Sequence, residues 1–378
     1  MIKFLLILLI LIEKLIKLNL LVLKREISGY PKIVKKFENN FSKYIGKTYG
    51  ITFCNGTSSI EAALYALDLS PGDEILVTSS TFHASLGPVR NLGYNLIFVD
   101  IDEVTFTIDC SDLKKKINEK SKALLIVHPW GYPCNMEKVT GIVKTNNLYL
   151  VEDCSHAHGA IYDKKKVGSF SDISCFSLQG NKAIGAGEGG IALTDNETYY
   201  LRMSKYGHLN RHEKEFEKNL DFTDFKKTGL SKKLRAHPLG ISMAYVDFKY
   251  LDLINKYKIK IYNKIDLILK NYKSIKLMEV NKKAERGGFF GGYPFFFTDK
   301  KNISEIKKVF NKYKINLIKY PWYLHHQMDI FGKTKTKLTT TEKMSDQFYM
   351  IHIPYFLNFN FRKLKKCLSE CRNNKLVE

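Results

Sequence analysis

Disulfide and metal-binding motifs are missing from this sequence. Its seven cysteines form no Cys-x-x-Cys pair and no His/Cys cluster at the spacing of metal ligands. They are Cys54, Cys110, Cys134, Cys154, Cys175, Cys367 and Cys371. Free, buried thiols are typical of a reducing compartment. We therefore expect no bound metal and a cytoplasmic location.

Dense basic blocks and nucleic-acid-binding motifs are also missing, although the chain is strongly basic. It has 60 Lys and Arg against 38 Asp and Glu, a formal net charge of +22. The lysines are spread along the whole chain, so the charge indicates compositional bias, and no nucleic-acid partner is predicted. A secondary use of this charge is the attraction of an anionic, nucleotide-linked substrate.

The N-terminal segment lacks an apolar run of the length that crosses a bilayer. Residues 4–12 are all apolar, but Glu13, Lys14 and Lys17 interrupt the pattern before residues 18–23. A signal-peptide cleavage site is missing as well. We expect residues 1–26 to form an atypical apolar helix that packs on the enzyme or on a partner subunit. Contact of residues 1–23 with the inner face of a membrane is the alternative.

The rest of the chain is typical of an α/β protein of 378 residues, long enough for two domains. Strand-like runs at residues 49–54, 73–78, 97–102, 123–128 and 148–151 alternate with helical stretches. This alternation predicts a mainly parallel sheet between helices. The pattern then changes to lysine-rich helices and short strands at 291–297 and 350–354. We therefore predict a large domain over residues 27–251 and a small α+β domain over 252–378.

The most informative stretch is residues 175–190. A strand-like run ends near Ser177, a single lysine follows at position 182, and glycines then stand at 185, 187, 189 and 190. Glycines let the backbone adopt positive φ and pass close to a neighbour. A lysine on a loop between two buried strands is partly desolvated, which lowers its pKa and makes its amine a nucleophile toward a carbonyl. The alternative is a solvated hairpin lysine.

An acidic residue, Asp153, follows the strand-like run at 148–151. The carboxyl ends of strands are where such sheets bind ligands. Asp153, Ser177 and Lys182 together supply an anion for a ring nitrogen, a hydroxyl for a phosphate and an amine for an aldehyde. Those are the requirements of pyridoxal 5'-phosphate (PLP).

These two segments resemble the DegT-type (DegT/DnrJ/StrS) sugar aminotransferases, PLP-dependent enzymes of fold type I. The similarity rests on Ser177, Lys182 and the Glu-Gly-Gly run from Glu188, and on Val-Glu-Asp-x-x-His-Ala-x-Gly-Ala from Val151. It extends over residues 27–378. The resemblance implies a large domain with a seven-stranded type of sheet and a small C-terminal α+β domain.

The resemblance also implies roles for individual residues. Lys182 would bind the cofactor covalently and transfer the substrate proton, and Asp153 would keep the pyridine nitrogen protonated. The other implied cofactor contacts are Gly56, Thr57, Ser58 and Ser177 for the phosphate, Phe82 for stacking on the ring, and His156 near the ring oxygen. Lys233 and Arg235 match a segment that reaches the neighbouring subunit's site. His325 matches a loop that approaches the substrate, and it is the residue of that loop expected to contact the substrate. The residues alone leave three alternatives open. Residues 56–58 could be an ordinary helix N-cap, Phe82 could be a core residue, and Lys233 and Arg235 could belong to a solvated basic face.

The implied function is transfer of an amino group from glutamate or glutamine to a keto-sugar, expected to be nucleotide-linked, or to a keto-cyclitol. The enzyme would be a homodimer serving amino-sugar or surface-polysaccharide biosynthesis. One alternative is a PLP-dependent sugar dehydratase of the same fold, although those relatives carry histidine at the position of Lys182. The other is a non-catalytic basic scaffold protein, which does not explain why Asp153, Ser177 and Lys182, the three residues that PLP requires, are all present.

Overall fold

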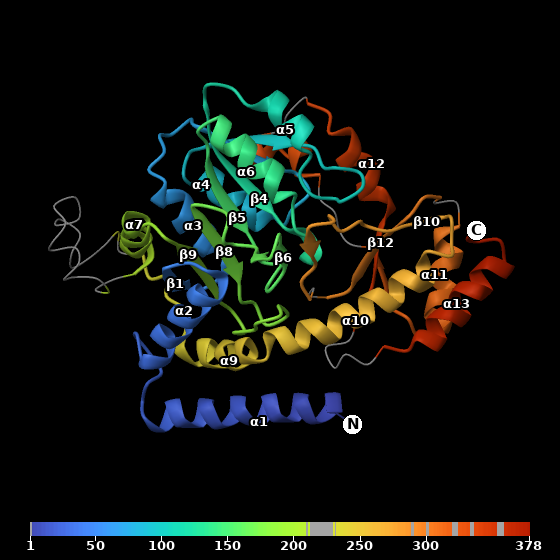
Figure 1. Ribbon diagram of the computed structural model, residues 1–378, viewed down its shortest axis with the longest axis horizontal. Coiled ribbons are helices and arrows are strands. Elements are labelled where there is room, and N and C mark those ends of the chain that lie inside the picture. Colours follow the sequence, from blue (N-terminus) through green and yellow to red (C-terminus); the bar gives the residue numbers. More distant parts are fainter. Residues whose placement is uncertain are drawn as a thin grey trace.

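The computed structural model describes residues 2–208, 211, 230, 232–288, 291–299, 302–319, 324–332, 336–353 and 359–378, with only the backbone of residues 2–4. A seven-stranded sheet forms the centre of the large domain (Figure 1). Its strands are, in spatial order, β1 (Tyr49–Phe53), β9 (Gly190–Thr194), β8 (Ile173–Ser177), β5 (Tyr149–Asp153), β4 (Ser121–Val127), β2 (Glu74–Thr78) and β3 (Asn95–Val99). Strands β8, β5, β4, β2 and β3 are parallel, and β9 runs antiparallel to both neighbours. The mainly parallel sheet that the sequence predicts is confirmed.

Helices cover both faces of this sheet. On one face lie α3 (Gly56–Ala66) and α7 (Glu197–Gly207), and on the other α5 (Cys110–Lys116) and α6 (Met136–Thr145); α2 (Lys32–Ile45) and α9 (Pro238–Lys249) pack at the β1 end. Along β4, Ala123 and Leu125 join the core under α3, whereas Leu124 and Ile126 join the core under α6. Successive side chains of a strand point to opposite faces. Because both faces are buried, these strands are nearly continuous apolar runs.

The C-terminal part folds around an antiparallel sheet of four strands. Their spatial order is β10 (Ile275–Lys276), β12 (Tyr293–Phe297), β14 (Phe348–Ile351) and β13 (Leu317–Lys319). The helices of this part are α10 (Leu251–Leu269), α11 (Ile303–Lys312), α12 (Thr339–Gln347) and α13 (Phe361–Asn373). One of its strands, β11 (Ala284–Glu285), pairs with β6 (Ile161–Tyr162) of the large domain, and β6 also pairs with β7 (Lys165–Lys166). The domain limits at residues 26 and 251 stay a prediction.

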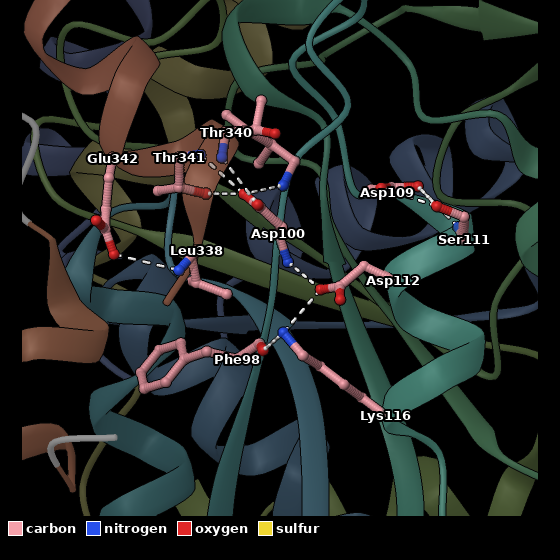
Figure 2. Close-up of polar contacts among 11 residues, drawn as sticks. Phe98, Asp100, Asp109, Ser111, Asp112, Lys116, Leu338, Thr340, Thr341 and Glu342 are labelled. Atoms are coloured by element: carbon pink, nitrogen blue, oxygen red, sulfur yellow. Dashed lines mark hydrogen bonds and ion pairs between the residues drawn. The ribbon is translucent and has the colours of Figure 1, made fainter. Parts of the chain in front are cut away.

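A carboxylate from the large domain caps a helix of the small one (Figure 2). Asp100, just after the edge strand β3, accepts hydrogen bonds from the N–H groups of Thr340 (2.9 Å) and Thr341 (2.8 Å) in the first turn of α12. The first N–H groups of a helix have no carbonyl partner within it. Asp112 in turn accepts from the N–H of Asp100 (2.7 Å) and pairs with Lys116 (2.7 Å). This network fastens the small domain to the β3 edge of the sheet.

Helix α1 (Ile2–Leu23) lies outside these layers and runs along α9, at the bottom of Figure 1. Ile10 is buried against Val246 and Ile254. Glu13 pairs with Lys249 at 2.6 Å, and Lys14 pairs with Asp247 at 2.7 Å. In the part of the chain that the structure describes, no helix combines the length and apolar character that a membrane span requires.

Removing the Lys14 ammonium is expected to destabilise the fold. The Asp247 side chain is only 3% exposed, and burial raises the pKa of its carboxyl group. Its Oδ2 accepts a hydrogen bond from Gly185 N–H (3.0 Å), in the loop that follows Lys182. Breaking a buried ion pair costs several kcal/mol because the remaining charge loses its closest partner, and Asp247 would keep only the weaker Coulombic attraction of Lys258. We expect Lys14→Met to lower the free energy of unfolding, measured in urea, by about 3 kcal/mol.

The double variant Lys14→Met/Asp247→Asn provides the control. The asparagine side chain keeps an oxygen that accepts the hydrogen bond from Gly185 N–H. It carries no charge, so it does not require a cation as partner. The second substitution should therefore restore more than half of the lost stability. Additive losses from the two substitutions would show that the ion pair is not the source of the effect.

Candidate active site

A cavity of about 380 Å³ opens at the carboxyl ends of β4, β5 and β8. This is the edge of a parallel sheet at which α/β proteins bind ligands. Seven of the residues predicted from the sequence line it: Gly56, Thr57, Phe82, Asp153, His156, Ser177 and Lys182. The fold therefore brings together side chains from segments more than a hundred residues apart.

One wall of the cavity is the N-terminus of α3. Asn55 caps the helix by accepting a hydrogen bond from Ser58 N–H (2.7 Å), and Gly56 and Thr57 line the cavity. Helix N-termini attract anions through their unpaired N–H groups and their dipole. A Cβ at Gly56 would stand 2.9 Å from the Cβ of Ser177. The glycine thus allows the helix N-terminus and the serine hydroxyl to face one anion.

At another wall lies the carboxylate of Asp153. It is 5% exposed and accepts hydrogen bonds from the Ser85 hydroxyl (2.7 Å to Oδ2) and from Ser155 N–H (3.0 Å to Oδ1). These contacts fix the orientation of the carboxylate. Local sequence pattern does not indicate Ser85, which belongs to a 3₁₀ turn, η1 (His83–Ser85), and lies 68 residues from its partner Asp153 in the chain. The one sequence feature that links Ser85 to the site is that it follows Phe82 by three residues.

Lys182 is a buried lysine rather than a solvated hairpin residue. Its side chain is 9% exposed, in a loop closed by hydrogen bonds from Gly180 N–H to Gly187 O (2.7 Å) and from Ala186 N–H to Leu178 O (2.7 Å). Burial lowers the pKa of the amine from 10.5 to about 8, and the charge of Asp153 partly opposes this shift. About a tenth of the amine is therefore neutral, and nucleophilic, at pH 7, far more than for a lysine with a pKa of 10.5.

We expect the rate of covalent PLP attachment to the apoprotein to rise with pH, with a midpoint near pH 8. Only the neutral amine attacks an aldehyde, and the pKa of Lys182 is about 8. The rate should therefore increase about sixteenfold from pH 6.5 to pH 8 and only about twofold more above pH 8. Stopped-flow absorbance of the attached cofactor measures it. A rate that keeps rising to pH 10 would indicate an amine with an unshifted pKa.

Two further residues line the same cavity. His156 accepts a hydrogen bond from Trp130 N–H at Nδ1 (3.4 Å), and burial together with the charge of Lys182 lowers the pKa of the imidazole. The ring is therefore neutral, with its hydrogen on Nε2. Phe82 is 55% exposed and lies against His83, with ring centroids 3.9 Å apart. An aromatic ring exposed at a cavity is placed to stack on a ligand rather than to fill the core.

Four of the predicted residues do not line the cavity of the single chain. Ser58 uses its N–H in the α3 cap, Lys233 is exposed, and the Arg235 guanidinium lies 5.6 Å from the centroid of the Tyr30 ring. His325 is 2% exposed and donates from Nδ1 to the Ser79 carbonyl (2.9 Å). This contact holds the turn that leads from β2 to Phe82.

A buried cluster that the sequence analysis did not identify lies behind Asp153. Ligand-type atoms of His128, Glu152 and Cys154 all fall within 4.8 Å of one another. Glu152 accepts hydrogen bonds from His128 Nε2 (3.0 Å) and from the N–H groups of Gly168 (2.8 Å) and Phe170 (3.0 Å). Burial also raises the pKa of the Cys154 thiol to about 12, which disfavours the thiolate that metals bind. We assign this cluster to the packing of β5.

Comparison with known proteins identifies the family. The family model described as the DegT/DnrJ/EryC1/StrS aminotransferase family matches residues 18–366. The chain belongs to this family. GDP-perosamine synthase of Escherichia coli O157:H7 is 43% identical over 176 residues, which are 47% of this chain and 48% of that protein. The dTDP-3-amino-3,6-dideoxy-alpha-D-galactopyranose transaminase of Aneurinibacillus thermoaerophilus is 34% identical over 218 residues, 57% and 58% of the two chains. The matched segments thus span about half the length of these curated relatives.

Solved structures support the same fold for this DegT/DnrJ/EryC1/StrS family member. The aminotransferase from Psychrobacter cryohalolentis superposes with a TM-score of 0.84 at 21% identity, over 96% of both chains. The sugar aminotransferase CalS13 from Micromonospora echinospora gives 0.82 at 19% identity, again over 96% of both. The fold type I architecture that the resemblance implies is confirmed.

Proposed function

We propose that this family member is a PLP-dependent aminotransferase that transfers an amino group from glutamate or glutamine to a keto-sugar. The observation that carries the proposal is one cavity that contains an anion-binding helix N-terminus, the oriented carboxylate of Asp153 and the buried amine of Lys182. The residues fit PLP, because the α3 N-terminus and Ser177 suit its phosphate, Asp153 its ring nitrogen and Lys182 its aldehyde. When bound, PLP supplies an electron sink for the substrate carbanion.

The chain's own residues would orient the cofactor and move protons. Lys182, released when the donor amine takes its place, would remove and return the proton at the substrate Cα as general base and acid. Its pKa of about 8 suits both roles near neutral pH. Asp153 would hold the proton on the ring nitrogen, and Phe82 would cover the ring and exclude water.

A nucleotide-linked keto-sugar is the acceptor that we propose, with a keto-cyclitol as the second class. Relatives named GDP-perosamine synthase and dTDP-3-amino-3,6-dideoxy-alpha-D-galactopyranose transaminase support this choice. The net charge of +22 would attract the diphosphate of such a substrate. We further propose cytoplasmic amino-sugar or surface-polysaccharide biosynthesis by a homodimer, in which Lys233 and Arg235 serve the neighbouring subunit's site and His325 positions a loop beside the substrate.

A donor–acceptor screen tests the proposal. Purified protein loaded with PLP is mixed with glutamate or glutamine and with GDP- and dTDP-linked keto-sugars, and the products are analysed by mass spectrometry. We expect the donor's keto acid together with an acceptor whose carbonyl is replaced by an amine. An unaminated deoxy-sugar as product would favour the dehydratase, and protein that takes up no PLP would favour the scaffold protein. Either outcome would reject the proposal.

A further inference from the structure

Helix α1 presents an apolar face to the surroundings of the protein. Six of its side chains are at least half exposed: Leu5, Leu9, Leu15, Ile16, Val22 and Leu23, at 51–80%. With about 100° between successive residues, the exposed apolar positions cover roughly half of the helix circumference. Asn19 is the one polar residue within that half. We call this surface the α1 apolar face.

The charged residues of α1 whose side chains the structure describes, Glu13, Lys14 and Lys17, lie on the opposite side, against the protein. Glu13 pairs with Lys249 of α9, Lys14 pairs with the buried Asp247, and the Lys17 ammonium lies 5.8 Å from the centroid of the Tyr245 ring. A helix at a protein surface normally has the reverse arrangement, with polar residues facing water. The ion pairs fix the rotation of α1, so this helix cannot turn its leucines inward without breaking them.

Basic groups lie at the C-terminal end of the α1 apolar face. Lys24 and Arg25 directly follow the helix and are exposed. An apolar helix face with cations at its end suits an anionic lipid surface, where leucines enter the acyl boundary and cations meet the headgroups.

We propose that α1 attaches the enzyme to an anionic membrane surface, lying in the plane of the interface. A partner helix covers only a narrow stripe of a helix, whereas a planar lipid surface covers half of its circumference at once. Because the other half packs on α9, lipid reaches α1 from one side only. The family match begins at residue 18, so Leu5, Leu9, Leu15 and Ile16 of this surface lie outside it, whereas Val22 and Leu23 lie inside it. This attachment is independent of the proposed catalytic function.

Sedimentation of the full-length, PLP-loaded protein with lipid vesicles tests this proposal. We expect the protein to sediment with phosphatidylglycerol-containing vesicles and less with pure phosphatidylcholine vesicles. The variant Leu5→Gln/Leu9→Gln/Ile16→Gln should reduce the vesicle-bound fraction about tenfold. The matched control is Leu267→Gln, which changes an apolar residue of α10 that is 70% exposed and should bind as the unmodified protein does.

Circular dichroism confirms that each variant remains folded, so a loss of vesicle binding is assigned to the changed surface. Failure of the unmodified protein to bind anionic vesicles would overturn the proposal. Equal vesicle binding by the triple variant would overturn it too. If the triple substitution instead lowers the molecular mass in light scattering and leaves vesicle binding unchanged, the α1 apolar face is covered by a second copy of the chain.

Discussion

Lys182→Ala is expected to lower the turnover of glutamate to its keto acid by about 10⁴-fold. A positioned general acid–base contributes up to about that factor. In the proposed function the same amine would also attach the cofactor covalently, so its loss would remove two functions at once. Circular dichroism should show an intact fold, because Lys182 lies on a loop held by backbone hydrogen bonds rather than by its side chain. Turnover is measured as keto acid formed with saturating acceptor.

Lys258 offers a matched control for this substitution. It is 8% exposed, against 9% for Lys182, and burial lowers the pKa of its amine to about 8 as well. It does not line the cavity. Lys258→Met should therefore retain the covalently attached cofactor. If both variants lost the covalently attached cofactor, attachment would depend on a buried lysine in this region rather than on the position of Lys182.

Asp153→Asn is expected to lower turnover by about 10²–10³-fold while PLP still binds through Lys182. In the proposed role the carboxylate would stabilise the proton on the ring nitrogen of PLP. A neutral amide could not do so, and the cofactor would then accept electrons less well. Because Asn keeps the shape of Asp, the cavity itself should be preserved. The absorbance of the bound cofactor reports its attachment, and single-turnover rates report the chemical step.

The hydroxyl of Ser85 allows a graded comparison at the same carboxylate. Ser85→Ala removes the hydrogen bond to Asp153 Oδ2 and leaves the charge, so turnover should fall only about tenfold. A larger loss in Ser85→Ala than in Asp153→Asn would contradict the role that we give to the carboxylate.

Much of the large domain could be predicted from sequence because its strands are buried on both faces. Such strands are short apolar runs between helices, and their limits differ from the predicted ones by few residues. Residues 123–128 were predicted as a strand, for example, and β4 is Ser121–Val127. The predicted run 97–102 extends past the end of β3, Asn95–Val99, because Asp100 leaves the strand to cap α12. A contact between residues 240 positions apart has no local sequence signal.

The residues of the candidate site also fall into two groups, those with a local sequence signal and those without one. Residues that follow strands or begin helices, such as Asp153, Ser177 and Gly56, could be predicted from local pattern and family resemblance. Ser85 and the His128–Glu152 pair could not, because their partners are set by tertiary packing. The outward-facing leucines of α1 are another such case. The apolar pattern predicts a helix, but only the ion pairs of Glu13 and Lys14 decide which side faces the protein.

The location of the covalently attached cofactor tests the central claim most directly. PLP-loaded protein is reduced with borohydride, which makes the bond between the cofactor and its lysine permanent, and is then digested and analysed by mass spectrometry. We predict that the phosphopyridoxyl group is found on the peptide that contains Lys182, and that the Lys182→Ala variant has no specific label. Label on another lysine, or no label in the unmodified protein, would contradict the assignment of this cavity as a PLP site.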